Sequence, residues 1–156
     1  MLKFAKTDQD ILKPIYNFAQ SKKVKLYLVG GVLRDLILKR KKENPDFDFC
    51  LKNGALSFGQ KLARQLRAAY VILDQEHAAC RLVKRIGDKL YTFDFTDFRA
   101  PTIEKDLLHR DFTINSMALK LADVFSNADL NKTIIDPYFG REDLCHKTIK
   151  VTAEKS

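Results

Sequence analysis

The sequence contains no tryptophan, only three cysteines and no apolar run long enough to cross a lipid bilayer. A membrane span needs roughly 20 consecutive apolar residues, and charged residues interrupt the apolar segments of this chain. The scattered cysteines are too few for the disulfide framework of a small secreted protein. The sequence contains no CxxC or HxxxH pair that would predict a zinc site. Lys6, Asp8 and Asp10 stand where a signal peptide needs an apolar stretch. We therefore expect a soluble, cytoplasmic protein without membrane contact.

Basic residues outnumber acidic ones, with 28 Lys and Arg against 20 Asp and Glu and a net charge of +8. This excess favours a polyanionic partner, although a solvated basic surface produces the same excess. The basic residues are most concentrated at 22–25 and at 39–42. A length of 156 residues is typical of one domain, so we expect residues 1–156 to form a single domain.

Apolar periodicity and turn residues predict alternating helices and strands. The predicted helices cover residues 8–20 (with Thr7 as a cap), 32–39, 55–68, 103–110 and 112–119. The predicted strands cover residues 25–29, 46–51, 70–73, 79–86 and 89–97. The last two strands are separated by Gly87-Asp88, which indicates a hairpin. This order predicts an α/β (α+β) domain in which helices flank a small mixed sheet.

Two carboxylates share one face of the predicted strand 46–51. Side chains alternate along a strand, so Asp46 and Asp48 point to one side while Phe47 and Phe49 point to the other. Residues two apart on a strand are roughly 7 Å apart. Two carboxylates at this distance repel each other unless a cation lies between them, and a hard divalent metal is the natural one.

A third acid, Asp94, lies between Phe93 and Phe95 in the same alternating pattern. Three acids on two strands anchored by buried aromatic residues are typical of the platform that binds metal in phosphoryl or nucleotidyl transfer. The alternative is that Asp94 faces solvent and has no role in a site.

Paired glycines, Gly30 and Gly31, connect a predicted strand to a predicted helix that carries Arg34. Backbone N–H groups at such a turn can approach a phosphate, and Arg34 can add a charge-assisted hydrogen bond. No Walker A or GxGxxG pattern is present, and an ordinary strand-to-helix turn has the same sequence.

A second candidate for anion binding is the segment from His109 to Ala118. Within it, Asp111 could orient Arg110 toward a triphosphate. The alternative is an ion pair that only joins two helices.

Taken in order, five segments resemble one family: LVGGVLRDLIL, DFD, FDFTDFR, HRDFTINSMA and IIDPYFGREDL. The series extends from about Leu26 to Val151 and closely resembles the catalytic head of class II nucleotidyltransferases. These are the bacterial CCA-adding tRNA nucleotidyltransferases and their poly(A) polymerase relatives. The resemblance implies a nucleotidyltransferase head domain with the polymerase β-like fold.

The resemblance also implies roles for individual residues. Asp46 and Asp48 correspond to the aspartates that bind Mg²⁺, and Asp94 corresponds to a third catalytic acid. The implied nucleotide-binding residues are Gly30, Gly31, Arg34, Arg110, Asp111 and Asn115, of which Asp111 and Asn115 are expected to be partners of Arg110. His109 stands where the family has the first arginine of its RRD motif, so only the second, Arg110, is carried over.

The implied reaction is template-independent addition of nucleotides, from CTP or ATP or both, to the 3′ end of tRNA. Two metal ions would assist in-line attack of the RNA hydroxyl on the α-phosphate. A poly(A) polymerase head shares these motifs, and an RNA- or nucleotide-binding remnant without turnover is a third possibility.

The sequence departs from the family in two places. Nothing after Lys150 matches the family's neck, body and tail, so we expect an isolated head domain without the residues that read the base. The flexible loop before the RRD motif is reduced to a few residues around Arg99–Ile103. In this family a short loop is associated with addition of C without the terminal A.

Overall fold

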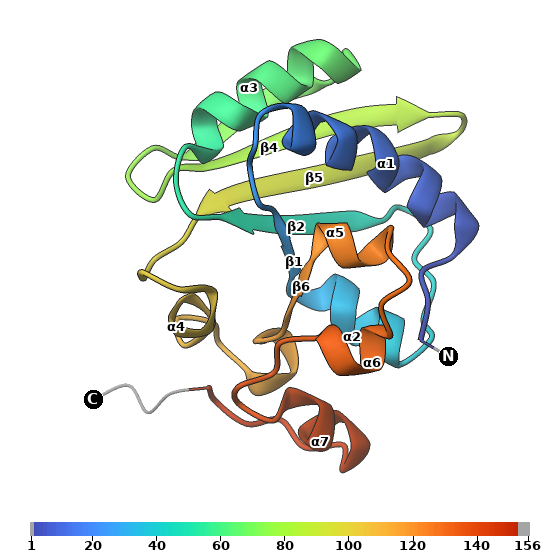
Figure 1. Cartoon of the computed structure of the whole chain (residues 1–156), viewed down its shortest axis with the longest axis vertical. Helices are drawn as coiled ribbons and strands as arrows, with labels where there is room; N and C mark the ends of the chain where they lie inside the picture. Colours follow the sequence, from blue (N-terminus) through green and yellow to red (C-terminus); the bar gives the residue numbers. More distant parts are fainter. Residues whose placement is uncertain (1, 153–156) are drawn as a thin grey trace.

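A six-stranded mixed sheet forms the centre of the computed structural model, which describes residues 2–152 (Figure 1). The strands are β1 (Tyr27–Val29), β2 (Asp46–Leu51), β3 (Ala69–Asp74), β4 (Ala79–Ile86), β5 (Lys89–Asp97) and β6 (Ala118–Lys120). Their order across the sheet is β3-β4-β5-β2-β1-β6. Strands β2 and β5 are parallel, and the other neighbouring pairs are antiparallel. The predicted mixed sheet flanked by helices is confirmed.

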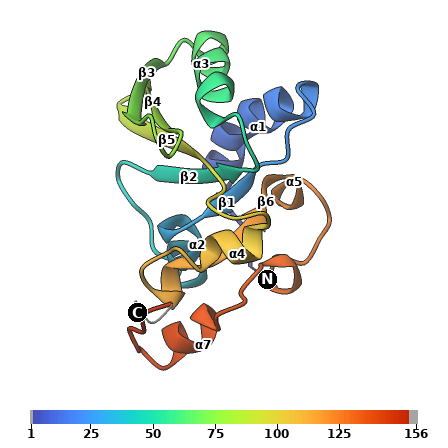
Figure 2. The same ribbon diagram turned by 90° about the vertical axis from the view of Figure 1, so that its left-hand side faces the viewer.

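Helices cover the sheet from both sides (Figure 2). They are α1 (Lys6–Ser21), α2 (Gly31–Ile37), α3 (Ala55–Leu66), α4 (Ile103–Leu107), α5 (Leu121–Val124), α6 (Leu130–Thr133) and α7 (Gly140–Cys145). Helices α1 and α3 lie on one side of the sheet, whereas α2, α4 and α7 gather below β2 at the other end of the molecule. Among residues 2–152, no helix combines the length and apolarity that a bilayer crossing requires.

The parallel pairing of β2 with β5 builds the main core under α1 and α3. Its register places Phe47 beside Phe93 and Phe49 beside Phe95. The rings of each pair are stacked, with centroids 5.8 Å and 4.8 Å apart. All four side chains are buried, and such aromatic pairs contribute about 0.5–1.5 kcal/mol beyond the area that they bury. The opposite side chains of β2 and β5 are thereby fixed on the other face.

A smaller core lies on that other face, beneath α4. Tyr27 and Val29 of β1 and Cys50 of β2 pack there against Ile103 and Leu107 of α4. The helix therefore covers one end of the face that carries the acidic residues and leaves the other end open.

The predicted helix over 112–119 is wrong. The structure has one 3₁₀ turn, η1 (Thr113–Asn115), followed by the strand β6. Strand β6 pairs with β1, whose backbone groups on that side are buried and need partners. This tertiary pairing overrides the local helical pattern.

The boundaries of the other predicted helices also differ from the prediction, among them the end of α4 and the start of α1. The predicted helix 103–110 ends at Leu107, and a turn carries the next three residues. Thr7 does not cap the first helix, because α1 begins one residue earlier, with Ala5 at the N-cap position and no side-chain hydrogen bond there.

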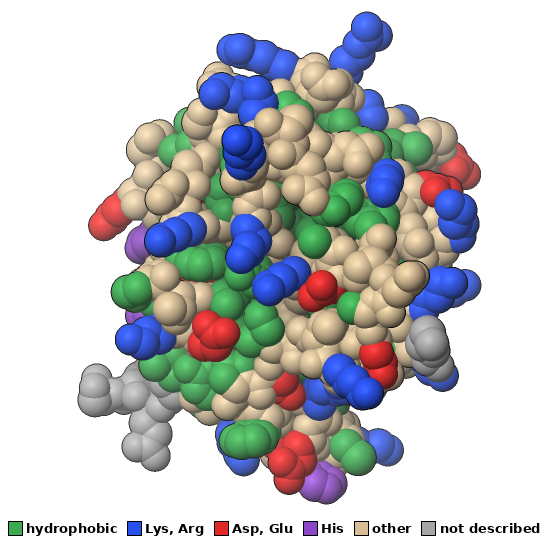
Figure 3. All heavy atoms as spheres, in the orientation of Figure 1, with side chains coloured by type: hydrophobic (Ala, Val, Ile, Leu, Met, Phe, Trp, Pro, Cys, Tyr) green, Lys and Arg blue, Asp and Glu red, His purple; other side chains and the backbone are tan. Residues whose placement is uncertain are grey.

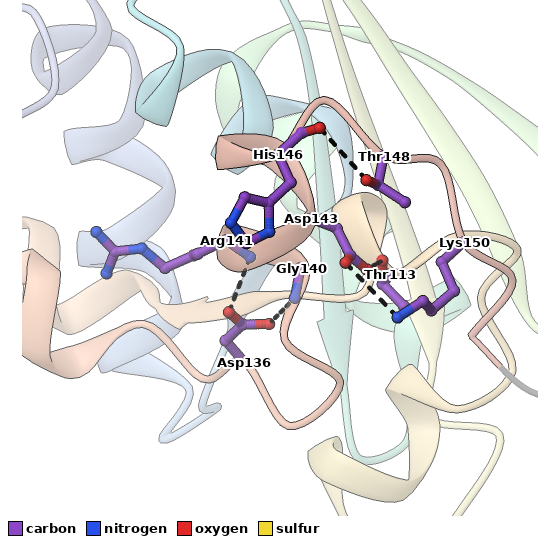
Figure 4. A network of polar contacts seen from close by, with 8 residues as sticks. All are labelled: Thr113, Asp136, Gly140, Arg141, Asp143, His146, Thr148 and Lys150. Carbon is purple, nitrogen blue, oxygen red and sulfur yellow. Dashed lines mark hydrogen bonds and ion pairs between the residues drawn. The ribbon is translucent and has the colours of Figure 1, made fainter.

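The short helix α7 holds the 3₁₀ turn in place (Figure 4). The carboxylate of Asp136 accepts hydrogen bonds from the backbone N–H groups of Gly140 and Arg141, at 2.7 and 3.0 Å. The Thr113 hydroxyl donates to the buried carboxylate of Asp143. A Cβ on Gly140 would lie 2.2 Å from the Thr113 carbonyl oxygen, so the contact between helix and turn requires glycine.

We expect Gly140→Ala to destabilise the fold, because the obstacle is backbone that cannot rotate away. The loss in the free energy of unfolding should be about 3 kcal/mol, the upper end for overpacking, measured by urea denaturation. Gly31→Ala is the control, since its Cβ would meet only the end of the flexible Arg34 side chain at 3.1 Å. It should change stability by no more than about 1 kcal/mol. Equal effects of the two substitutions would contradict this account of α7.

Candidate functional site

The polar side chains on one face of strand β2 become more buried along the strand, from solvent toward the small core. Asp46 is exposed, Asp48 is half-buried and Cys50 is buried. Asp48 lies opposite Asp94 of β5 in the parallel register. The structure thus brings together the three acids that the sequence predicted on one face.

Asp94 is held by an arginine that the sequence analysis did not identify. Arg81 of β4 lies directly opposite Asp94 across the hairpin. Its Nε and Nη2 donate to the two Asp94 oxygens at 2.8 and 2.9 Å. The Arg81 side chain is 43% exposed and that of Asp94 is 20% exposed. Both oxygens of the third acid are therefore occupied by one guanidinium fork.

The carboxylates of Asp46 and Asp48 are free, in contrast to that of Asp94. Within residues 2–152, neither takes part in a hydrogen bond to a side chain or in an ion pair. Burial raises the pKa of Asp48, and the charges of Asp94 and Asp46 raise it further, while Arg110 opposes them. An uncompensated pair of carboxylate oxygens is the donor set that a hard divalent cation prefers, so these residues fit a metal. In the same part of the chain, no three His, Cys, Asp or Glu side chains form a closed cage.

The glycine turn lies directly against one of these carboxylates, that of Asp48. Gly30 has φ = +75°, and a Cβ there would lie 3.2 Å from Oδ2 of Asp48. Both the backbone conformation and the close approach exclude larger residues. The turn can therefore place backbone N–H groups beside a ligand of the acid pair.

Arg34 lies over the same turn and is oriented by two acceptors. Its Nη1 donates to Oδ1 of Asn115 at 3.0 Å, and its Nε donates to Asp35 at 3.2 Å. The predicted pairing of Asn115 with Arg110 is therefore wrong, because η1 directs this amide to Arg34. The contact joins residues 81 positions apart in the sequence.

Arg110 approaches the acid face from the turn after α4. Its Nη2 donates to Sγ of Cys50 at 2.8 Å and lies 3.6 Å from Oδ2 of Asp106. Asp111, its predicted partner, is exposed and offers its backbone carbonyl to Thr152 instead. The end of α4 explains this difference, because it turns Arg110 back over its own helix toward the residue four positions earlier.

Cys50 and Asp106 were not singled out in the sequence. Asp106 is 3% exposed and is the charged partner of Arg110 in this buried cluster. Burial raises the pKa of Cys50 to about 12, so its thiol is neutral at physiological pH. The spacing of four residues between Asp106 and Arg110 on a predicted helix was the available signal.

We expect Asp48→Asn to raise the Tm at pH 7 when EDTA removes metal. The raised pKa means that the folded state binds the Asp48 proton more tightly than the unfolded state. Ionising this carboxyl therefore destabilises the fold as the pH rises above the ordinary value of 3.8, and the gain from Asn should vanish below that pH.

The control for this substitution is Asp94→Asn, which breaks the fork with Arg81 and should lower the Tm at pH 7. Thermal unfolding followed by circular dichroism between pH 3 and 7 gives both results. An Asp48→Asn protein that is no more stable at pH 7 than the parent would contradict the inference that the charge of Asp48 is uncompensated in the folded state.

Comparisons with known proteins agree with this geometry. A family described as "Poly A polymerase head domain" matches residues 26–150. A CC-adding tRNA nucleotidyltransferase of Synechocystis is 36% identical over 126 residues, which cover 81% of this chain and 27% of that protein. An A-adding tRNA nucleotidyltransferase of Halalkalibacterium halodurans is 28% identical over 94% of this chain and 35% of its own length.

A solved structure of the Thermotoga maritima CCA-adding enzyme complexed with tRNA is similar over 97% of this chain, with a TM-score of 0.76 and 29% identity. The match covers 34% of that enzyme, so the chain spans about a third of the length of such relatives. The chain belongs to the poly A polymerase head domain family.

Proposed function

We propose that the chain transfers nucleotides from a nucleoside triphosphate to the 3′ end of tRNA. The observation that carries this proposal is the pair of free carboxylates, Asp46 and Asp48, of which Asp48 lies against the Gly30 turn. A relative with this head domain is named for CC addition to tRNA, and a solved neighbour is a CCA-adding enzyme complexed with tRNA.

The acid pair is the proposed binding site of a divalent metal, with Mg²⁺ as the ion. When bound, such ions neutralise phosphate charge and lower the pKa of an attacking hydroxyl. Asp46 and Asp48 hold the ion through their oxygens. Asp94, fixed in orientation by Arg81, is the third acidic residue beside the place where the RNA 3′-hydroxyl would lie.

The triphosphate is bound by groups on the opposite side of the pair. The Gly30 and Gly31 backbone permits close approach, and Arg34 and Arg110 supply positive charge near the leaving phosphates. Asn115 keeps Arg34 over the turn. These groups exist in position before a ligand arrives, which favours charge stabilisation during transfer.

The nucleotide added is proposed to be C. The connection between β5 and α4 contains only residues 98–102, and four hydrogen bonds fasten it. A short, fastened connection cannot move as a lever that would remodel the site for ATP. The CC-adding relative from Synechocystis supports the same preference.

The domain organisation and the cellular location of the protein are part of the same proposal. Both apolar cores share the central sheet, so residues 1–156 are proposed to act as one catalytic head domain. A reaction on tRNA places the protein in the cytoplasm.

The test of the function is incorporation of labelled CTP into tRNA that lacks its 3′ CCA, with Mg²⁺ present. We expect the chain to incorporate label and Asp46→Ala to retain less than about a tenth of the rate, because loss of a metal ligand costs several kcal/mol of barrier and 1.36 kcal/mol is tenfold. Asp88→Ala, at the exposed hairpin turn, removes the same charge and should keep the parent rate. Triphosphate or RNA binding without incorporation would support a binding remnant instead.

Sequencing the product ends tests the nucleotide preference. With CTP and ATP both present, we expect most products to stop after two C residues, because the short connection cannot remodel the site. Ends in CCA would contradict the role given to residues 98–102. A tract of A would indicate a poly(A) polymerase.

A further inference from the structure

A basic cavity of about 500 Å³ opens beside the acid pair. It lies between the start of α1, the end of α2 and the loop that leads into β2. Its floor is apolar and includes the buried side chains of Phe4, Phe47 and Tyr91. Its cationic lining consists of Lys3, Lys39, Arg40, Lys41, Lys42 and Lys89. Asp46 is also part of the wall, so the cavity reaches one of the two proposed metal ligands.

The positive charge of this cavity is largely unpaired. All six cationic residues are exposed, and three acids, Asp8, Asp35 and Asp46, share the wall with them. Within residues 2–152, the only ion pair of the six joins Lys42 to Asp35 at 3.8 Å. Figure 3 shows Lys and Arg side chains scattered over most of the visible face, with acidic side chains interspersed among them in its lower half and at its edges. The cavity is therefore a local concentration of the charge excess that the composition predicted.

The basic residues 39–42 follow directly on the end of α2. The Arg40 N–H donates to the Asp35 carbonyl at 2.8 Å, and the Lys39 N–H donates to that of Leu36 at 3.2 Å. This pair of bonds is the Schellman ending of a helix, whose left-handed position usually holds glycine. Here that position is Lys39, with φ = +56°. Glycine fits this position without backbone strain, so Lys39→Gly removes the charge while keeping the local structure.

We propose that this cavity binds the phosphate backbone of the RNA strand whose 3′ end reaches Asp46. The inference rests on the proposed function for its choice of RNA. Of the six cations only Lys42 is in an ion pair within residues 2–152, so most of the positive charge is available to phosphate groups, and long lysine side chains can follow a flexible single strand. An acidic protein would satisfy the charge equally well but would have no reason to lie against the metal-binding carboxylate.

The chain contains a matched control for Lys39. Helix α1 ends in the same way, with Lys23 in the left-handed position at φ = +55°. The Val24 and Lys23 N–H groups donate to the carbonyls of Ala19 and Gln20 at 2.9 and 3.1 Å. Lys23 lines a different hollow, which contains no residue of the acid pair. Lys39→Gly and Lys23→Gly therefore remove the same charge from the same local structure.

The experiment measures binding of a labelled single-stranded RNA by fluorescence anisotropy over a range of salt concentrations, in EDTA and without nucleotide. Loss of one phosphate contact lowers the slope of log K against log salt by about 0.7 and the affinity by about fivefold at 0.1 M salt. We expect this change for Lys39→Gly and parent behaviour for Lys23→Gly. Both variants should keep or raise the Tm, because glycine suits the position.

A second pair of variants covers the neighbouring positions. Arg40→Gln/Lys41→Gln should lower the slope by about 1.4, twice the single change, whereas Lys22→Gln/Lys25→Gln should not. Equal losses in both members of either pair, unchanged slopes, or a parent that does not bind RNA would overturn the inference. The binding experiment measures no turnover. If CTP incorporation fails but Lys39→Gly still lowers the salt slope and the affinity for RNA, only the proposed function is rejected.

Discussion

The parallel pairing of β2 with β5 determines both the stability and the chemistry of this domain. One register stacks Phe47 on Phe93 in the core and sets Asp48 beside Asp94 on the opposite face. Because side chains alternate along a strand, neither arrangement can shift without the other. The buried aromatic face thus offsets the cost of holding like charges close together on the exposed face.

The arginines around this face are divided between two tasks. Arg81 occupies Asp94, which leaves Asp46 and Asp48 free for a cation. Arg34 and Arg110 are held by other residues near the glycine turn and so remain directed at an anion. If the two latter arginines paired with the free acids, the site would neutralise itself. Other partners hold them instead, Asn115 and Asp35 for Arg34 and Cys50 and Asp106 for Arg110, and these contacts fix the guanidinium positions.

The features that depend on local pattern were predicted from the sequence. Alternation placed Asp46 and Asp48 on one face, and the Gly87-Asp88 turn identified the hairpin. That two-residue turn also determines that Arg81 faces Asp94, so this pair was available from the sequence but was missed. The helix predicted over 112–119 failed for a different reason. Its end is strand β6, and pairing with a distant segment is not encoded in helical spacing.

Asp106 connects the short β5–α4 connection to anion binding. Its Oδ1 accepts a hydrogen bond from the Arg99 backbone N–H at 2.7 Å, and its Oδ2 faces Arg110 at 3.6 Å. The Phe98 N–H is bonded to the Leu51 carbonyl at 2.8 Å, so the connection is tied to β2 as well. A buried carboxylate with both oxygens engaged cannot release one partner without leaving a charge unpaired. Asp106 therefore couples the position of the connection to that of Arg110.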